Sequence, residues 1–315
     1  MGLDLLDTPV RLTWDFPDDA TGQQGPSLPA VAEAVMDAGV FFVTLQGRPL
    51  LHPALEEVLE ILGGGCQLLL TCCGSQEELT RLARLSPSGA QVLLNITSFA
   101  RDESKVDLKR LLQVVLDLRE IGFEPHIVFT PLRENINNIP TLLSFCVEHK
   151  IPKFKLPNAH IGDSFHDYSA EQLPRWQDLE TFRETWKNFV ESGCSLPEME
   201  IHDLFLWEIM TPGQKQNRAE YGGCQAGNSL SHVDCHGVVH PCAAWPQPLG
   251  CLTEQSLEEI WNNSERFAVC EAIAQRPEGC HECSALDICF GGCRGLARNL
   301  NRFAGERDLM CSGPR

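Results

Sequence analysis

The residues with the clearest chemistry are cysteines, and most of them gather in the last third of the chain. Of the 15 cysteines, ten follow residue 223. The densest group has the pattern Cys-x2-Cys-x5-Cys-x3-Cys, and one further cysteine follows after a gap. Its members are Cys280, Cys283, Cys289, Cys293 and Cys311. A looser group, Cys-x12-Gly-x4-Cys, runs from Cys224 to Cys242. Closely spaced thiolates on short loops hold either an iron–sulfur cluster or structural zinc, and spacing alone leaves both open.

The expected compartment favours metal over disulfides. Residues 1–7 show no basic start followed by an apolar run, so we expect no signal peptide and a cytoplasmic protein. No stretch reaches 18 apolar residues without charge, so we expect no membrane span. In a reducing compartment clustered cysteines point to a metal site. Four outlying cysteines, Cys66, Cys72, Cys73 and Cys146, are instead expected to be small buried hydrophobic residues.

The overall charge limits the classes of partner. The formal net charge is −18 and hydrophobic residues make up 43% of the chain, which is a globular composition. A nucleic-acid partner is not expected, because phosphate binding needs a basic surface that this composition lacks.

Before the cysteine-rich part, the sequence alternates segments typical of strands with segments typical of helices. Short β-rich runs are expected as strands at 10–14, 40–45, 67–72, 91–96, 126–129, 153–156 and 199–202. Amphipathic runs are expected as helices at 28–37, 54–62, 76–85, 106–121, 136–149 and 172–192. Repeated strand–helix units predict an α/β fold with a parallel sheet, either open or closed into a barrel.

The pattern changes near residues 211–213, where the chain becomes polar, glycine-rich and dense in cysteine. We therefore expect a domain of residues 1–212 and a second of residues 213–315. One clear helix is expected in the second domain, with Ser256 and Glu259 forming a capping box. Residues 221–315 have too little apolar sequence for an independent core, so metal ligation should stabilise them. Proteolysis of the metal-free protein is expected to begin after about residue 212.

The cysteine pattern resembles the SPASM domain of radical SAM maturases that modify ribosomal peptides. All seven motif cysteines are present, and segments such as 238–242 and 289–293 fit the family's surrounding sequence. In that family the two groups interleave. The resemblance implies two auxiliary [4Fe–4S] clusters, the first of which would take Cys224, Cys242 and Cys293. The second cluster would take Cys280, Cys283, Cys289 and Cys311.

The first cluster lacks an obvious fourth thiolate. Cys235 is expected at a hairpin tip, too far along the strand from Cys242 to share one cluster. Cys251 is a better candidate, and a non-cysteine ligand or an open iron is equally compatible.

Residues 1–212 resemble the radical SAM partial (β/α)6 barrel but depart from it at two motifs. Working enzymes carry Cys-x3-Cys-x2-Cys after the first strand, whereas residues 15–25 contain no cysteine here. The family's Gly-Gly-Glu-Pro motif is replaced by Gln46-Gly47-Arg48-Pro49. A guanidinium in place of that carboxylate would repel the ammonium group of S-adenosylmethionine. We therefore do not expect S-adenosylmethionine to bind, nor the chain to be an autonomous radical SAM enzyme.

A barrel without these cysteines, followed by a complete SPASM motif of hairpin and helix, is similar to the SPASM domain protein of GeoRSP systems. That resemblance implies three partners: a radical SAM/SPASM enzyme, a small peptide-chaperone protein and a precursor peptide. It implies an iron–sulfur accessory protein that serves peptide modification as a redox or scaffold subunit. The alternatives are a peptide- or partner-binding module with structural clusters or zinc, and an enzyme that uses an open iron of the first cluster.

Overall fold

The computed structural model describes residues 5–17, 27–100, 106–161, 168–211, 223–300 and 307–313. The chain divides into two compact units, each assembled from separate stretches of sequence. The first unit comprises residues 1–93, 120–123 and 225–275, and the second comprises residues 94–119, 124–224 and 276–315. The domain boundary expected at residue 212 rests on the change in composition near residues 211–213 and stays a prediction.

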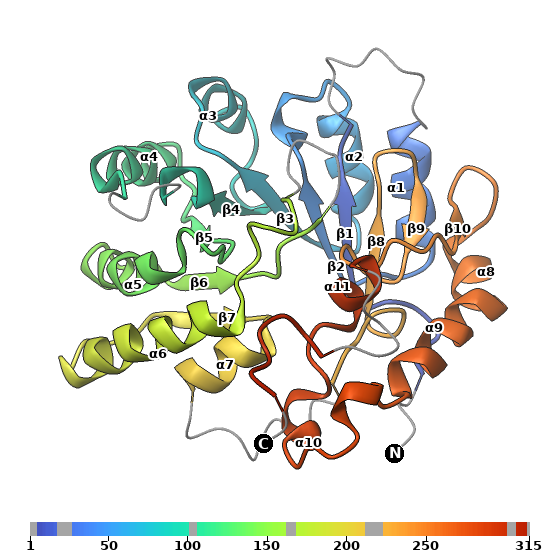
Figure 1. Ribbon diagram of the computed structural model, residues 1–315. Helices are drawn as coiled ribbons and strands as arrows, with labels where there is room; N and C mark the ends of the chain where they lie inside the picture. The colour runs from blue at the N-terminus through green and yellow to red at the C-terminus, as the bar shows by residue number, and fades with distance from the viewer. Residues whose placement is uncertain are drawn as a thin grey trace. The chain divides into compact units, whose positions relative to one another are not determined.

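The first unit is built on a mixed sheet with the strand order β10-β9-β8-β1-β2-β3. Its strands are β1 (Arg11–Asp15), β2 (Phe42–Gln46), β3 (Gln67–Cys72), β8 (Leu230–Val233), β9 (Val238–His240) and β10 (Gly250–Cys251). Strands β8, β1, β2 and β3 run parallel, as Figure 1 shows, while β9 and β10 are antiparallel to their neighbours. The carboxyl ends of the four parallel strands therefore share one edge of the sheet.

Alternating apolar residues explain why these strands form and what they bury. In β1, Leu12 and Trp14 are buried, and in β2, Val43 and Leu45 are buried. The helices of this unit present apolar stripes of their own; α1, for example, buries Val31 and three neighbours on the same face. These helices are α1 (Leu28–Asp37), α2 (Leu55–Leu62), α3 (Gln76–Leu82), α8 (Leu257–Trp261) and α9 (Ser264–Ala274).

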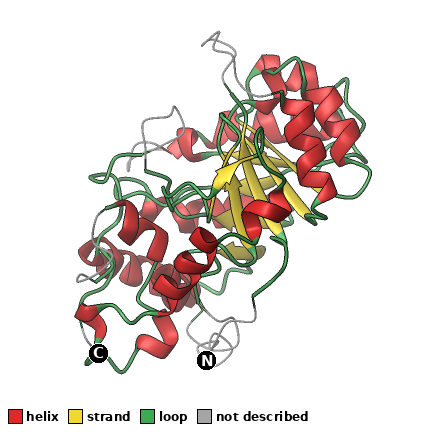
Figure 2. Cartoon of the chain, turned by 90° about the vertical axis from the view of Figure 1, so that its right-hand side faces the viewer, coloured by secondary structure: helices red, strands yellow, loops and turns green. Residues whose placement is uncertain are grey.

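The second unit contains three parallel strands in the order β5-β6-β7. They are β5 (His126–Val128), β6 (Lys153–Leu156) and β7 (Glu198–Ile201), and β4 (Gln91–Asn95) spans residues of both units. Figure 2 distinguishes the strands, in yellow, from the helices, in red. The longer helices that follow these strands or precede them are α4 (Leu108–Glu120), α5 (Ile139–Glu148), α6 (Trp176–Glu191) and α7 (Leu204–Met210). Two short helices near the C-terminus are α10 (Leu286–Cys289) and α11 (Arg294–Asn299).

The α/β fold and the predicted elements are confirmed, with boundaries within a few residues of those expected. The Ser256–Glu259 capping box is also present. The one clear helix expected after residue 213 is α8, and α9, α10 and α11, which the sequence pattern does not indicate, also lie there.

Residues 225–275 have no core of their own but share the core of the first unit with residues 1–93. Val233, Val239, Trp245, Ile260 and Trp261 are buried in the first unit. Pairing of β8 with β1 extends the sheet of that unit, so residues 225–275 draw stability from apolar packing.

Candidate functional site

Four of the predicted cysteine ligands line one pocket in the second unit. They are Cys280, Cys283, Cys289 and Cys311. Phe205 of α7 and Leu286 of α10 complete the apolar part of its lining, and Arg307 contributes a charge. The short 3-10 turn η7 (Glu278–Cys280) carries the first cysteine, and the Cys283 amide donates to the Cys280 carbonyl at 3.2 Å. The segment of residues 280–311 thus places four cysteines around one small pocket.

The loop between Cys289 and Cys293 depends on left-handed backbone conformations. Phe290 ends α10 with φ 51°, and Gly291 and Gly292 both have φ 81°. A Cβ atom on Gly291 would lie 2.9 Å from Pro277 Cγ, so glycine is required there by space as well as by conformation. This reversal separates Cys289 from Cys293, which caps the next short helix, α11.

Asp308 accepts hydrogen bonds from the segment that begins at Cys293 and from the segment that contains Cys311. Its Oδ2 accepts from the Cys293 amide at 3.0 Å, and its Oδ1 accepts from the Met310 amide at 2.8 Å. Its carbonyl accepts from the Cys311 amide at 3.0 Å. One residue therefore fixes the backbone beside a cysteine of each predicted set.

The protonation of the thiols reflects their burial and their closeness. Burial raises the pKa of Cys280 and Cys289, and the neighbouring thiols of Cys311 and Cys283 raise both further. For Cys280, the guanidinium groups of Arg294 and Arg307 act in the opposite direction. Thiolates crowded in this way repel each other, and a bound cationic iron core would relieve that repulsion.

These donors fit an iron–sulfur cluster, whose several irons accept sulfurs spread around a core. Among the residues that the structure describes, no group of three or more His, Cys, Asp or Glu side chains surrounds a point suited to a single metal ion.

The other predicted set is divided between the units, with Cys224 and Cys293 in the second and Cys242 in the first. Gly223 packs against the Phe290 ring, with the position of its Cβ only 2.9 Å from ring carbon Cγ. This contact brings Cys224 next to the loop that leads to Cys293. Both thiols interact with the charge of Arg294. The structure therefore brings two of these three cysteines together.

Cys242 follows β9 at the base of the β8–β9 hairpin. The Gly227 amide donates to the Pro241 carbonyl at 2.8 Å, and the Trp245 amide donates to the Cys242 carbonyl at 3.0 Å. Cys270, which shows no signal in the sequence, is buried at the same base, where its Sγ donates to the Gly227 carbonyl at 3.4 Å. Cys270 belongs to no closely spaced group of cysteines in the sequence, so only the fold shows that it lies at the base of the hairpin.

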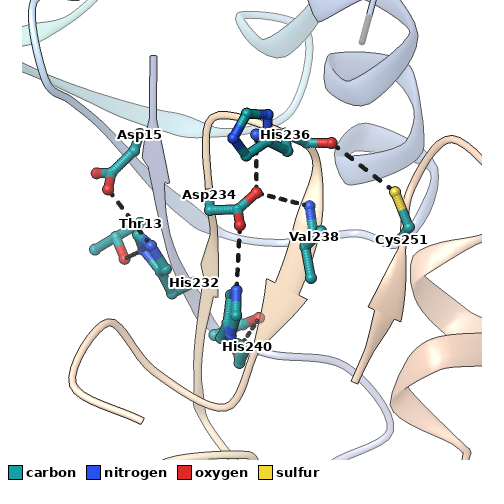
Figure 3. A network of polar contacts seen from close by, with 9 residues as sticks. Thr13, Asp15, His232, Asp234, His236, Val238, His240 and Cys251 are labelled. Carbon is teal, nitrogen blue, oxygen red and sulfur yellow. Dashed lines mark hydrogen bonds and ion pairs between the residues drawn. The ribbon is translucent and has the colours of Figure 1, made fainter. Parts of the chain in front are cut away.

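A buried histidine ties the hairpin to the first strand of the barrel. His232 of β8 lies with its Nδ1 2.9 Å from Thr13 Oγ1 and its Nε2 3.5 Å from Asp15 Oδ2, as Figure 3 shows. Both partners come from β1, which pairs with β8. These polar contacts add to the backbone pairing and fix the hairpin relative to the carboxyl edge of the sheet.

Asp234 organises the tip of the hairpin. Its Oδ1 accepts from the amides of His236 at 2.8 Å and Val238 at 3.0 Å, and its Oδ2 lies 3.4 Å from His240 Nε2. Burial by itself would raise the pKa of Asp234, but these hydrogen bonds to His240 and to the backbone lower it overall. The carboxylate therefore stays ionised and holds the turn (Figure 3).

The strand register argues against Cys251 as the fourth ligand of the first cluster. Cys251 pairs with Val238, at the tip end of β9, whereas Cys242 follows the other end. Its Sγ lies 3.9 Å from the His236 carbonyl and 3.0 Å from Thr253 Oγ1, so it faces the tip (Figure 3). Four residues of extended chain span about 13 Å, which exceeds the size of one cluster.

The carboxyl edge of the first unit also holds the segment Gln46-Gly47-Arg48-Pro49. Gly47 has φ 81°, and a Cβ there would lie 2.9 Å from the Phe16 carbonyl, so the tight turn after β2 requires glycine. Arg48 interacts with Cys73, whose pKa burial raises to about 11. Cys73 is therefore a protonated thiol at neutral pH. Cys72 and Cys146 are fully buried, as expected, whereas Cys66 and Cys73, also expected to be buried, are only partly so. Residues 18–26 of the loop after β1 lie outside the described residues.

Comparison with known proteins identifies the cysteine-rich part. Residues 224–284 match the model of the SPASM family, described as an iron–sulfur cluster-binding domain. The PqqA peptide cyclase of Xanthomonas axonopodis pv. citri (strain 306) is 27% identical over 186 residues, which cover 57% of this chain and 47% of that protein. The corresponding cyclase of Xanthomonas oryzae pv. oryzae (strain MAFF 311018) is 25% identical over the same length. The chain thus spans about half the length of these curated relatives.

Solved structures share the fold over nearly the whole chain. SuiB of Streptococcus suis, bound to precursor peptide SuiA, has a TM-score of 0.71 at 18% identity. The match covers 98% of this chain and 77% of the SuiB chain. Native anSMEcpe with bound AdoMet has a TM-score of 0.64 at 14% identity and covers 96% of this chain and 94% of its own. Within the described part of this chain, no helix has the length and apolar character to cross a membrane. The chain therefore shares the α/β fold of SuiB and anSMEcpe, and its residues 224–284 match the SPASM iron–sulfur cluster-binding domain.

Proposed function

We propose that the chain is an iron–sulfur accessory protein that acts with a radical SAM enzyme in peptide modification. The observation that carries this proposal is the pocket in which four thiols meet, within a chain that matches the SPASM domain. In this proposal Cys280, Cys283, Cys289 and Cys311 hold one [4Fe–4S] cluster. The other would be held by Cys224, Cys242 and Cys293, together with a fourth group. Bound clusters would supply electron transfer or a rigid brace for a protein surface.

The chain is proposed not to start radical chemistry itself. The sequence has no cysteine before Cys66, so the loop after β1 offers no thiolate to a cluster. Arg48 occupies the motif position where a carboxylate would support the ammonium group of S-adenosylmethionine, and like charges repel there. A partner enzyme must then supply the radical.

The proposed partners are a radical SAM/SPASM enzyme, a small peptide-chaperone protein and a precursor peptide. Two similarities support a peptide substrate. The curated relatives are named peptide cyclases, and the SuiB structure holds a precursor peptide. Both proteins differ from this chain in most residues, so the peptide itself is set by features particular to this chain.

The test uses the full chain reconstituted with iron and sulfide under anaerobic conditions. We expect about eight irons and eight sulfides per chain, because two four-iron clusters bind. Reduced protein given S-adenosylmethionine should yield no 5′-deoxyadenosine, whereas adding the partner enzyme and peptide should give turnover. Iron-dependent cleavage by the chain alone would overturn the accessory role.

A binding module is the second candidate, favoured by the peptide complex of SuiB. In it the clusters, or zinc in their place, only brace a surface that holds the precursor peptide or the partner enzyme. Bound zinc without labile sulfide would support this role. So would clusters whose reduction changes neither peptide binding nor turnover by the partner.

A further inference from the structure

Arg294 is a buried cation placed directly after a predicted cluster ligand. It is the first residue of α11, and Cys293 caps that helix by accepting from the Leu296 amide at 3.4 Å. Only 2% of Arg294 is exposed. A guanidinium keeps its charge under all ordinary conditions, and burying that charge is costly unless negative groups lie nearby.

The groups near Arg294 are thiols from both predicted ligand sets. Burial lowers the pKa of Arg294, and the charges of Cys224, Cys280 and Cys293 oppose that effect. Cys224 and Cys293 belong to the first set, and Cys280 belongs to the second.

Geometry places Arg294 beside both sets independently of charge. Arg294 directly follows Cys293 of the first set at the start of α11. Gly291 lines the four-thiol pocket of the second set, and its Cβ position lies 3.9 Å from Arg294 Cδ.

Two other charged groups lie at the four-thiol pocket. Arg307 lines it, and its charge acts on Cys280. Asp308 also lines it, but its two oxygens accept from the amides of Cys293 and Met310. Arg294 is distinguished by acting on thiols of both sets.

We propose that Arg294 tunes the reduction potentials of both clusters by compensating the negative charge of their thiolates. This inference rests on the proposed function, because it requires the clusters to be bound. A thiolate-ligated cluster gains negative charge on reduction, and its potential responds to nearby charge and hydrogen bonds. A fixed cation in a buried environment stabilises the reduced form more than the oxidised form, so it raises the potential. Arg294 would touch neither substrate nor iron and would act on the clusters through the charge of their thiolate ligands.

The test compares midpoint potentials in redox titrations followed by electron paramagnetic resonance. Four variants of the reconstituted full chain separate the roles: Arg294→Met, Arg294→Lys, Arg307→Met and Arg298→Met. Arg298 lies exposed on the same helix and serves as the matched control. We expect Arg294→Met to lower both potentials, Arg307→Met to lower only that of the four-thiol cluster, and Arg298→Met to change neither. Arg294→Lys keeps the charge and should retain most of the parent potentials.

The outcomes distinguish this inference from the proposed function. Unchanged potentials in Arg294→Met, with both clusters assembled, would overturn the role of Arg294 and leave the proposed function standing. If Arg294→Met assembles no clusters, Arg294→Lys decides: assembly with lysine supports the charge, and failure with both residues shows a purely structural role. A parent chain without labile sulfide would overturn the proposed function and the inference together.

Discussion

At the scale of single residues, the proposed ligands differ in what their loss should do. Cys283→Ala removes one of the four thiols that share the pocket. We expect the iron content after reconstitution to fall by about half, because one of two clusters loses a ligand while the other keeps its own. Iron and sulfide assays measure this directly. Cys194→Ala, at an exposed position of the same unit, is the control. An unchanged iron content in Cys283→Ala would exclude that thiol as a ligand.

Asp308 should matter for the persistence of the clusters although it supplies no thiol. Asp308→Ala leaves the amides of Cys293 and Met310 without their acceptor, and each such loss costs about 1–3 kcal/mol when the group is buried. We expect faster release of iron to a chelator. Asp308→Asn keeps one carbonyl oxygen and should release iron at an intermediate rate. Equal rates in all three proteins would show that the segments are held by other contacts.

Part of this site is predictable from the sequence and part is not. The spacing from Cys280 to Cys289 indicates a shared metal site, because short loops limit how far thiols can separate. Arg294 and Asp308 gave no such signal. An arginine next to a cysteine is usually solvated, and only tertiary packing buries Arg294. The partners of Asp308 follow from a loop closure that no local pattern encodes.

At the scale of elements, local periodicity predicted the strands and longer helices, but not their distant pairing. Alternation in β1 and the apolar stripe of α4 are properties of short windows, and both elements formed as expected. The parallel pairing of β1 with β8 joins residues about 220 positions apart, so no window contains it. The helices α10 and α11 are short and take their positions from the cysteine loops, which leaves little periodicity to detect.

A charge network on β6 and β7 makes a prediction about acid stability. Glu200 lies 3.2 Å from Lys155, 3.4 Å from Lys153 and 3.0 Å from His202. Burial would raise the pKa of Glu200, but the hydrogen bond from His202 and the charge of Lys155 lower it well below its usual range. A carboxyl group whose pKa is lowered on folding stabilises the protein above its unfolded pKa of about 4.3, and that contribution is lost as the pH falls.

Glu200→Gln should therefore lower the free energy of unfolding at neutral pH and reduce its dependence on pH in the acid range. Urea unfolding at pH about 7 and pH about 3 measures both effects. Glu198→Gln is the matched control, because Glu198 contacts the same Lys153 but is 70% exposed. A parent protein and a Glu200→Gln variant with the same pH dependence would show that the network contributes nothing to folding.

At the scale of the whole molecule, the two compact units divide the cysteine-rich part of the chain between them. Residues 225–275 belong to the first unit, where β8 pairs with β1 and Arg266 donates to the carbonyls of Gly227 at 2.6 Å and Leu6 at 2.8 Å. Residues 276–315 belong to the second unit. There Asn299 donates to the Ile161 carbonyl and the Trp176 amide donates to the Leu309 carbonyl, both at 3.1 Å. Residues 225–275 are held by a sheet and a core, whereas residues 276–315 contain the four thiols of the pocket.

This difference refines where the metal-free protein should be cut. Loss of the proposed clusters would remove ligation from residues 276–313, where few apolar side chains of the described residues 276–300 and 307–313 are buried. The packing of Trp245 and Trp261 in residues 225–275 would be unaffected. We expect limited proteolysis of the metal-free chain to cleave within residues 276–313 well before it cleaves within residues 225–275. Reconstitution with iron and sulfide should protect residues 276–313. Mass spectrometry of the fragments over time locates the cuts, with the loaded protein as the control. Cleavage at equal rates in both segments would mean that the clusters stabilise the hairpin as much as the C-terminal loops. Cleavage in 276–313 that iron does not slow would mean that they stabilise neither.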